Sequence, residues 1–403
     1  MKKFVWILLL LLLTGCGAQQ NGPDKDSLPP LEAEQQATEA PATAPADPSV
    51  LYTETRDSGL VIAVSDDGQL LVSGADVEED IRESGILKDY LDKVTTLRVG
   101  AGVKVIGEKA FAAFPQLQKV ILEDSVEEIG YAAFGDCTAL TDVSFGDGLT
   151  VIADYAFSGC TMLKDAALKE QVTTVGSYAF SGCTALKNVS VGPNVTSFGH
   201  HVFADCTALA SVRLGSNVST SAFQDCATLE SLVLDSTVSE IGDRAFAGCT
   251  ALTSIQFSDQ LQTIGSYAFS GCTALQTISV PNSVTLVEKE AFAGCTALDT
   301  IELAADGTLE LGDAAFAGCT ALKVLVLPEG VWKLGEQVFS GCSALEKLTL
   351  PLSLKEIGYG FLNGTYALRT LGYRGNANQW YGVKKATNWS EGAGTLNLSY
   401  KVT

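Results

Sequence analysis

A block of apolar residues recurs along most of the chain at a nearly constant interval. It reads Ala-Phe-x-x-Cys-x-x-Leu, as from Ala133 to Leu140, and ten copies carry the cysteine. The steps between successive cysteines are 23, 23, 23, 20, 23, 23, 23, 24 and 23 residues. A period of this size predicts stacked supersecondary units rather than one globular core.

Each unit has the polar and apolar pattern of two short extended segments. In one copy, Val189-x-Val191 alternates as a strand with one buried face does, 192–194 reads as a turn, and 195–198 is a second extended piece. The Ala-Phe-x-x-Cys block then predicts a short helical turn. One side of the unit is apolar, so it must stack on its neighbours to bury that side.

The two end units keep the register but change the core residue. Phe114 takes the cysteine position in the first unit and Thr365 takes it in the last. Counting both, the sequence predicts twelve units. Two irregularities lie inside the array: three residues are missing before Phe223, including the Ile-Gly pair, and one extra residue lies near Gly307.

The unit resembles that of the BspA-like leucine-rich repeats. Ile278 to Val284 matches the middle of that family's 23-residue unit, and Gly265 to Cys272 matches its end. The resemblance implies a leucine-rich-repeat solenoid, mainly β with short helical turns, over residues 96–371. It also implies an N-terminal cap region over 50–95 and a C-terminal cap region over 372–403. The family implies a bacterial surface protein that binds host matrix, glycans or other cells.

The N-terminus predicts export and lipid attachment. Lys2 and Lys3 precede an apolar run of ten residues that is too short to span a bilayer, and Cys16 follows Leu13-Thr14-Gly15. This arrangement resembles the lipobox of bacterial lipoproteins, with residues 1–16 as signal peptide and Cys16 as the acylated residue. An ordinary secretory signal is the alternative. Residues 17–49 are rich in proline and poor in large apolar side chains, which predicts a disordered acidic tether.

The charge balance argues against nucleic-acid binding. The chain has 47 acidic and 26 basic residues, for a formal net charge of −21, whereas phosphate backbones are bound by clustered Lys and Arg. No G-x-S-x-G, HExxH, P-loop or calcium-loop motif occurs, and no long non-repetitive block is left for a catalytic domain. We therefore predict no enzyme activity, no cofactor and no metal.

The repeat cysteines are predicted to form a buried column of free thiols, since each holds the same inward position and free Cys behaves as a small hydrophobe. Rungs about 4.8 Å apart do not exclude disulfides, which remain the alternative. The structural core set is Cys137, Cys160, Cys183, Cys206, Cys226, Cys249, Cys272, Cys295, Cys319 and Cys342.

The outward face of the first strand in each unit is the candidate ligand-binding surface, because repeat proteins use such a face for extended ligands. A merely solvated face is the alternative. The candidate residues are Ser190, Arg213, Gln256, Ser279, Glu302 and Thr349.

Two other groups of residues are weighed as sites. His200 and His201, the only histidines, fall in variable positions without a catalytic partner in motif form and are interpreted as exposed repeat variation. Trp380, Tyr381 and Trp389 are a second candidate, interpreted mainly as closing the last unit's core.

The predicted function is adhesion or interaction at the cell envelope, with the chain lipid-anchored and facing outside. The partner is an extracellular protein or glycan, in addition to the membrane at Cys16. The alternatives are a carbohydrate-active or other enzyme that uses the repeats as a frame, and a structural envelope protein without a specific ligand.

Overall fold

The structure, a computed structural model, describes residues 49–78, 80–81, 87–304, 307–394 and 396–402. The predicted signal peptide, Cys16 and residues 17–48 of the predicted tether lie outside this range. The described residues belong to one compact unit. In the described ranges, no helix combines the length and apolar character needed to span a bilayer.

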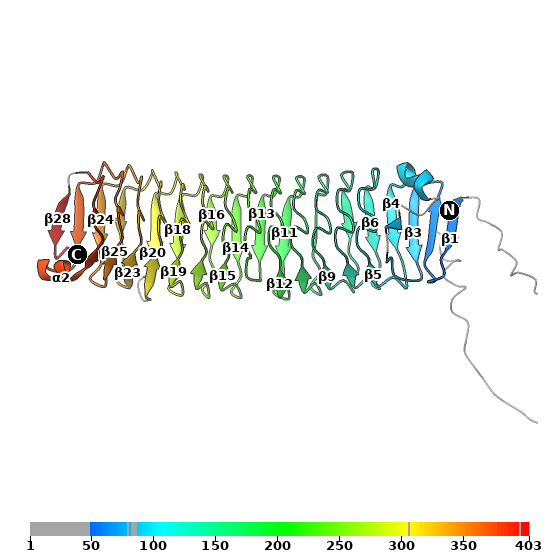
Figure 1. Ribbon diagram of the computed structural model, residues 1–403, viewed down its shortest axis with the longest axis horizontal. Coiled ribbons are helices and arrows are strands. Elements are labelled where there is room, and N and C mark those ends of the chain that lie inside the picture. The colour runs from blue at the N-terminus through cyan, green and yellow to red at the C-terminus, as the bar shows by residue number, and fades with distance from the viewer. Residues whose placement is uncertain (1–48, 79, 82–86, 305–306, 395, 403) are drawn as a thin grey trace, which may run out of the picture. The chain divides into compact units, whose positions relative to one another are not determined.

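Most turns of the chain add one strand to a front row and one short strand to a back row (Figure 1), and along the repeats both rows pair in parallel. Two turns within the repeats have only an isolated bridge in one row, from Asp165 to Asn188 in the front and from Val218 to Ile241 in the back. The front row consists of β3 (Gln69–Ser73), β4 (Thr96–Val99), β6 (Lys119–Leu122), β8 (Asp142–Ser144), β11 (Asn188–Val191), β13 (Ser211–Leu214), β14 (Ser231–Leu234), β16 (Ser254–Gln256), β18 (Thr277–Val280), β20 (Thr300–Leu303), β22 (Val324–Val326), β24 (Lys347–Leu350), β26 (Thr370–Tyr373) and β28 (Asn397–Tyr400). The back row consists of β5 (Val105–Ile106), β7 (Glu128–Ile129), β9 (Val151–Ile152), β10 (Thr174–Val175), β12 (Ser197–Phe198), β15 (Glu240–Ile241), β17 (Thr263–Ile264), β19 (Leu286–Val287), β21 (Leu309–Leu311), β23 (Val331–Leu334), β25 (Glu356–Ile357) and β27 (Lys384–Lys385).

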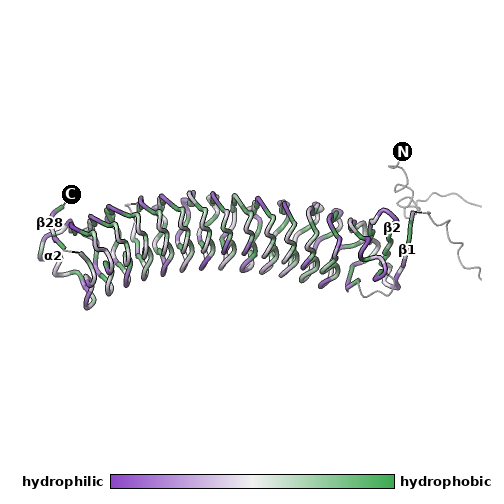
Figure 2. The backbone as a smooth tube through the Cα atoms, turned by 90° about the horizontal axis from the view of Figure 1, so that it is seen from above, coloured by the Kyte–Doolittle hydropathy of each residue, from purple (hydrophilic) through white to green (hydrophobic). Residues whose placement is uncertain are grey.

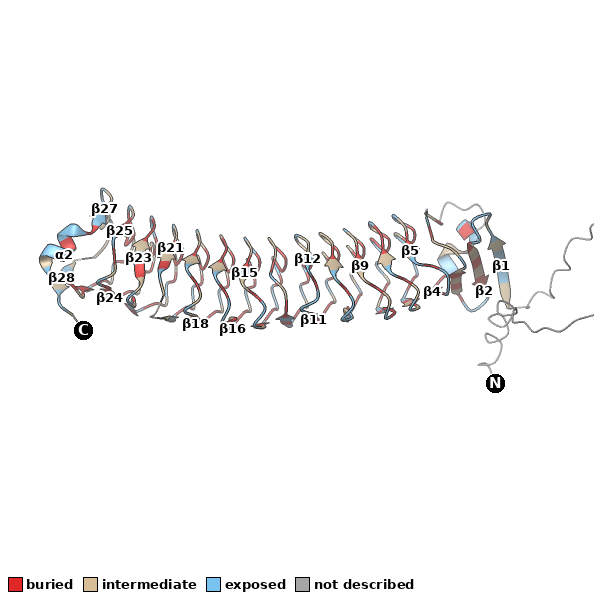
Figure 3. Cartoon of the chain, turned by 90° about the horizontal axis from the view of Figure 1, so that it is seen from below, coloured by how far each residue is buried: buried red, intermediate tan, exposed pale blue. Residues whose placement is uncertain are grey.

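The core lies between the two rows and repeats with the sequence (Figure 3). Apolar segments return at the same place in each turn (Figure 2), because the 23-residue period brings like residues into line. The phenylalanines of the Ala-Phe blocks stack along the axis, with ring centroids from 5.1 Å (Phe134 and Phe157) to 6.0 Å (Phe316 and Phe339) apart. Continuous stacking of this kind gives each unit an apolar neighbour on both sides.

The segment that was expected to be a helical turn is a series of tight turns. Cys137 N–H donates to Phe134 O and Leu140 N–H donates to Cys137 O, which are bonds between residues three apart. A helix cannot continue, because Ala132 and Asp136 both have positive φ angles of 48° and 57°. Phe134 N–H instead donates to Ala156 O of the next unit, so these turns also bond from unit to unit.

Both ends of the stack are closed by non-repetitive elements. At the N-terminal end, β1 (Val50–Thr55), β2 (Val61–Ser65) and β3 form an antiparallel meander, and a 3-10 helix (Leu87–Lys93) precedes β4. At the C-terminal end, α2 (Ala377–Gly382) begins with a capping box at Asn376.

The predicted solenoid is confirmed, but it has about 14 turns rather than twelve repeats. The flanks continue the stacking: β3 pairs in parallel with β4, Val77 bridges Ile106, and β27 pairs with β25. The sequence count missed these turns because they lack the Ala-Phe-x-x-Cys block.

The extra residue near Gly307 changes local pairing. The register between β21 and β23 shifts between Leu309 and Glu310, which is a bulge. On the front side, β20 and β22 belong to different sheets at this level.

Candidate binding face

The outward side of the front row, called here the front face, consists of side chains at the first and third positions of each strand. In β11 and β13 these positions are exposed while the second and fourth are buried. Five predicted site residues lie exposed on this face, in successive or nearby strands: Ser190, Arg213, Gln256, Ser279 and Glu302. Strand pairing places Ser190 beside Arg213, and Ser279 beside Glu302.

The front face is mostly small, polar and uncharged in its middle. Ser211 Oγ donates to Asn188 Oδ1 across two strands at 3.1 Å. Arg213 is held by Asp235, with its Nη2 2.7 Å from Oδ1 and its Nε 3.2 Å from Oδ2. This two-point contact fixes the guanidinium plane and leaves its other N–H groups available to an acceptor. The surface therefore suits a ligand that hydrogen bonds along several rungs.

Thr349 does not belong to this face as an exposed residue, and the sequence expectation is corrected here. Its side chain is only 2% exposed. It lies beside Gly372 of β26, and a Cβ built on Gly372 would meet Val402 at 2.8 Å and Thr349 Oγ1 at 3.4 Å. The C-terminal residues thus lie over this end of the front face, which no repeat pattern could show.

Apolar side chains are exposed where the front face approaches its C-terminal end. Val324 and Val326 of β22 are 54% and 46% exposed, at positions where most units have polar residues. The repeat period places both valines at outward positions of the front strand, so the sequence alone could have identified them as exposed apolar residues. The face therefore has a polar middle and an apolar segment.

The ten repeat thiols form a buried column in which each bonds to the preceding unit. Cys160 Sγ donates to Phe134 O at 3.2 Å and Cys183 Sγ to Phe157 O at 3.3 Å, and the column continues to Cys342 with Phe316 O. All ten are free and buried. Burial raises the pKa of the Cys183 thiol to about 12, so it stays protonated and unreactive at neutral pH.

An aromatic ladder that sequence reasoning missed runs along the edge before the Ala-Phe blocks. Tyr155, Tyr178 and His201 hold the same position in successive units, and successive ring centroids are 4.8 Å and 4.7 Å apart. Tyr131, one position earlier in its own unit, packs on Tyr155 at 5.5 Å with its ring tilted by 58°. The rings of Tyr155, Tyr178 and His201 lie face to face, so these faces are already in contact. The period would have revealed the ladder if this position had been compared across units.

The two histidines differ. His200 is exposed, as expected of repeat variation, whereas His201 is half-buried in the ladder. Burial lowers the pKa of the His201 imidazole, with a further contribution from neighbouring His200. Its Nδ1 atom is buried without a hydrogen-bond partner within the described residues.

The C-terminal aromatics mostly close the core. Trp380 is 4% exposed and packs edge-on against Trp389, which in turn stacks on Phe361. Tyr381 is instead 80% exposed. Across the described ranges, no group of three or more His, Cys, Asp or Glu side chains is arranged to hold a metal ion.

Comparison with known proteins identifies the repeat. The model of the BspA type leucine-rich repeat region matches residues 104–226, 216–308 and 309–381, which is more than half of the chain. The chain belongs to this family. No curated protein matches the sequence.

Solved structures of several bacterial leucine-rich repeat proteins are similar. One from Bacteroides ovatus is 22% identical, with 89% of this chain and 100% of that chain covered and a TM-score of 0.49. One from Eubacterium ventriosum is 20% identical, with 87% and 94% covered and a TM-score of 0.47. The T. pallidum leucine-rich repeat protein is 27% identical, with 50% and 91% covered and a TM-score of 0.39.

Family membership supports a class of function. Leucine-rich-repeat families are in general non-enzymatic and serve as protein-interaction modules. The chain is therefore best described as an interaction module built on a β-solenoid.

Proposed function

We propose that the chain is a bacterial surface lipoprotein that binds an extracellular protein or glycan through its front face. The observation that carries the proposal is a continuous row of exposed residues on the front face, from Ser190 in β11 to Glu302 in β20. The row crosses six successive front strands, and nearly every outward position in it has a polar side chain. A flat hydrogen-bonding row suits an extended polymer more than a compact small molecule.

The chemistry of the row favours a neutral or weakly charged ligand. Arg213 is already paired with Asp235, so the outward side chains from β11 to β20 carry little uncompensated charge apart from Glu302. The chain's formal charge of −21 also opposes a polyanionic ligand at long range.

The proposed location rests on the sequence of the N-terminus. Lys2, Lys3, the apolar run and Cys16 fit a lipobox, and two or more acyl chains on one residue would give stable anchoring. Residues 17–49 would then act as the tether between membrane and solenoid. Metabolic labelling with a palmitate analogue would show acylation in the natural chain and none in Cys16→Ala; labelling that survives the substitution refutes the anchor.

The binding proposal is tested with residues 50–403, screened against immobilised matrix proteins, mucins and glycans. Replacing Arg213, Gln256 and Glu302 together by alanine is expected to weaken a saturable interaction by roughly tenfold or more, since each side chain can supply a hydrogen bond to the ligand. Surface plasmon resonance would measure the change in Kd.

The matched control is a triple alanine variant on the back side, at Gln262, Glu336 and Lys355. These side chains are exposed and have the same composition of one amide, one carboxylate and one cation. Its affinity should equal that of the natural chain. Equal binding by the front-face variant, with both proteins folded by circular dichroism, would reject the front face as the site.

A further inference from the structure

The unit before Phe223, which is three residues short, interrupts the back row of strands and leaves the front row intact at this level. Leu214 and Phe223 are nine residues apart, whereas Val191 and Phe203 in the preceding unit are twelve apart. The front strands β11, β13 and β14 still pair residue for residue, and the rings of Phe203 and Phe223 still stack at 5.3 Å. The missing residues are therefore taken entirely from the back half of the turn.

The back row is interrupted at this level. β12 is the last strand of one back sheet and β15 is the first of the next, and between them Val218 makes only an isolated bridge to Ile241. Val218 and Ser219 stand where other units have their Ile-Gly pair, counted back from the phenylalanine, so this pair is replaced and the missing residues lie between Leu214 and Val218. Phe198 consequently lacks a full strand on one side and is only partly buried, whereas Val175 and Ile264 at the same position are buried.

A cleft of about 320 Å³ lies at this interruption. The side chains that line it come from three successive turns of the back row, and the ones that carry chemistry are Thr196, Phe198, His200, Ser216, Asn217 and Glu240. Its size is at the lower end for a ligand pocket and suits one sugar ring rather than a larger molecule.

The polar groups of the cleft include both donors and acceptors. Asn217 Oδ1 accepts the N–H groups of Ser239 and Glu240, at 2.8 Å and 3.2 Å, which fixes the amide and leaves its NH₂ group to donate. Glu240 is exposed and can accept two hydrogen bonds. Ser216 Oγ is buried and has no hydrogen-bond partner within the described residues.

This combination selects among ligand classes. No Lys or Arg lines the cleft, which disfavours phosphate and other anions, and a single carboxylate is too few for a divalent cation. The lining is too polar for a hydrocarbon. A carboxylate, an amide and hydroxyls beside the ring of Phe198 match a sugar, which needs paired donors and acceptors together with an apolar surface for its C–H groups.

We infer that this cleft is a saccharide-binding subsite, separate from the front face. Glu240 and the NH₂ group of Asn217 hydrogen bond the ring hydroxyls, and Phe198 contacts the C–H face. Because the front-face residues lie on the other row of strands, the two sites can be tested independently.

The test uses residues 50–403 and saturation-transfer-difference NMR with four free sugars: D-glucose, D-galactose, N-acetyl-D-glucosamine and L-fucose. At least one sugar is expected to bind saturably at millimolar concentration. Glu240→Gln and Phe198→Ile should each weaken that binding by roughly tenfold. Isoleucine is the residue that the same position has in other units, such as Ile264, so the second variant keeps the position apolar while removing the ring and its contacts with Phe203 and Phe223.

The matched control is Glu128→Gln, which changes the same strand position in a unit of regular length. It should bind as the natural chain does, and so should the triple front-face variant. The inference is overturned if none of the four sugars binds saturably, or if binding is unchanged in both cleft variants. It is also overturned if Glu128→Gln weakens binding equally, because the sugar would then contact the back row nonspecifically.

Discussion

One position in each unit adopts a costly backbone conformation, and stacking offsets part of that cost in the units where the residue is aromatic. Tyr155, Tyr178 and His201 have φ angles of 60°, 59° and 55°, in the left-handed region. That region costs a non-glycine residue roughly 1–2 kcal/mol. A stacked aromatic pair contributes about 0.5–1.5 kcal/mol, so the ladder offsets much of the cost. The stabilising contact is with the next unit, 23 residues away, and is invisible to any local pattern.

His201 makes the end of this ladder sensitive to pH. Its pKa in the folded state lies below the ordinary value of 6.5, because burial and nearby His200 disfavour the cation more than Asp205 favours it. The unfolded chain therefore takes up the proton first as pH falls, and the stability present above about pH 6.5 is progressively lost below it.

We predict that His201→Tyr keeps or raises the melting temperature at about pH 7.5 and removes part of its decline towards about pH 5.5. Tyrosine extends the ladder from Tyr178 and does not titrate in this range. Differential scanning calorimetry of both proteins at the two pH values measures this. An unchanged pH dependence would show that the imidazole contributes nothing. His200→Gln removes only the smaller contribution of the exposed neighbour and should leave most of the decline in place.

At the scale of one element, the distance between neighbouring turns limits which residues fit at each position of the unit. Gly265 follows β17, and a Cβ built there would meet Gly242 C and Ile241 O at 2.7 Å. Gly271, in the Ala-Phe-x-x-Cys block of the same unit, has a φ of +77° but its Cβ would meet nothing closer than 3.8 Å. Three other units have aspartate at the latter position, with φ near 60° at Asp136, Asp205 and Asp225.

The two glycines should therefore respond differently. Gly265→Ala is expected to destabilise by about 1–2 kcal/mol, because backbone of the preceding unit must move by an amount that the units with Ala153 or Glu288 at this position already accommodate. Gly271→Asp should cost less than about 1 kcal/mol, because the fold already accommodates aspartate there. Chemical denaturation followed by circular dichroism compares them. Equal losses would mean that conformational preference, and not the distance between units, governs both positions.

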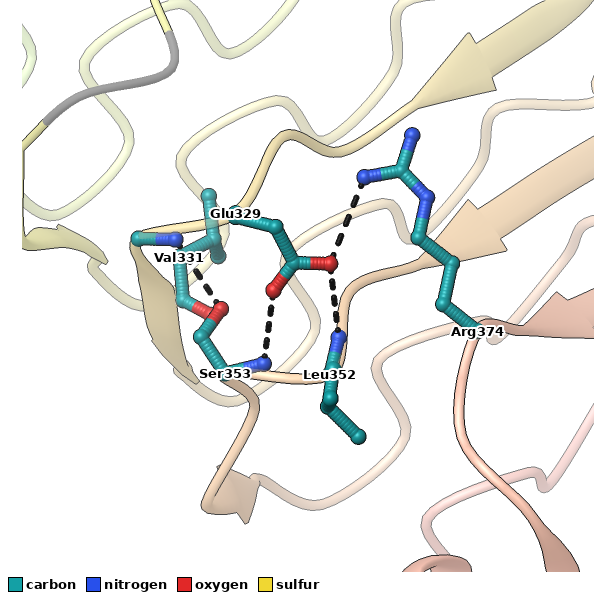
Figure 4. A network of polar contacts seen from close by, with 6 residues as sticks. Glu329, Val331, Leu352, Ser353 and Arg374 are labelled. Carbon is teal, nitrogen blue, oxygen red and sulfur yellow. Dashed lines mark hydrogen bonds and ion pairs between the residues drawn. The ribbon is translucent and has the colours of Figure 1, made fainter. Parts of the chain in front are cut away.

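The whole solenoid is a one-dimensional stack, so its ends need separate closure. At the C-terminal end, the carboxylate of Glu329 accepts the N–H groups of Leu352 and Ser353 at 3.1 Å and 3.0 Å, and Arg374 lies 3.4 Å away (Figure 4). Partial burial alone would raise the Glu329 pKa, but these donors outweigh it and hold the pKa below its usual value. One side chain thereby joins three successive turns at the C-terminal cap.

Loss of this network should loosen the end and leave the middle unchanged. In Glu329→Gln, amide hydrogen exchange is expected to accelerate around residues 350–375 but not in the central units, since repeat stability is coupled mainly between neighbours. The natural chain should show the same local loosening progressively as pH falls from about 4.5, the ordinary pKa of a glutamate, through the lower pKa of Glu329 in the folded chain. Uniform acceleration along the whole chain would contradict a local role.

The sequence by itself determined the periodic part of this protein. The 23-residue spacing requires Phe134, Cys137, Leu140 and their equivalents to point inward, because no isolated unit can bury its apolar side. The same spacing identified the outward row from Ser190 to Glu302. These features depend only on which residue types recur, so they could be predicted without coordinates.

Tertiary structure decided everything that breaks or crosses the period. Thr349 is buried because the C-terminal residues fold over it, and the flanks stack as additional turns without the repeat motif. The cleft beside Phe198 exists because three missing residues came from the back row and not from the front. Each depends on contacts between segments distant in sequence, and a local pattern of polar and apolar residues does not contain that information.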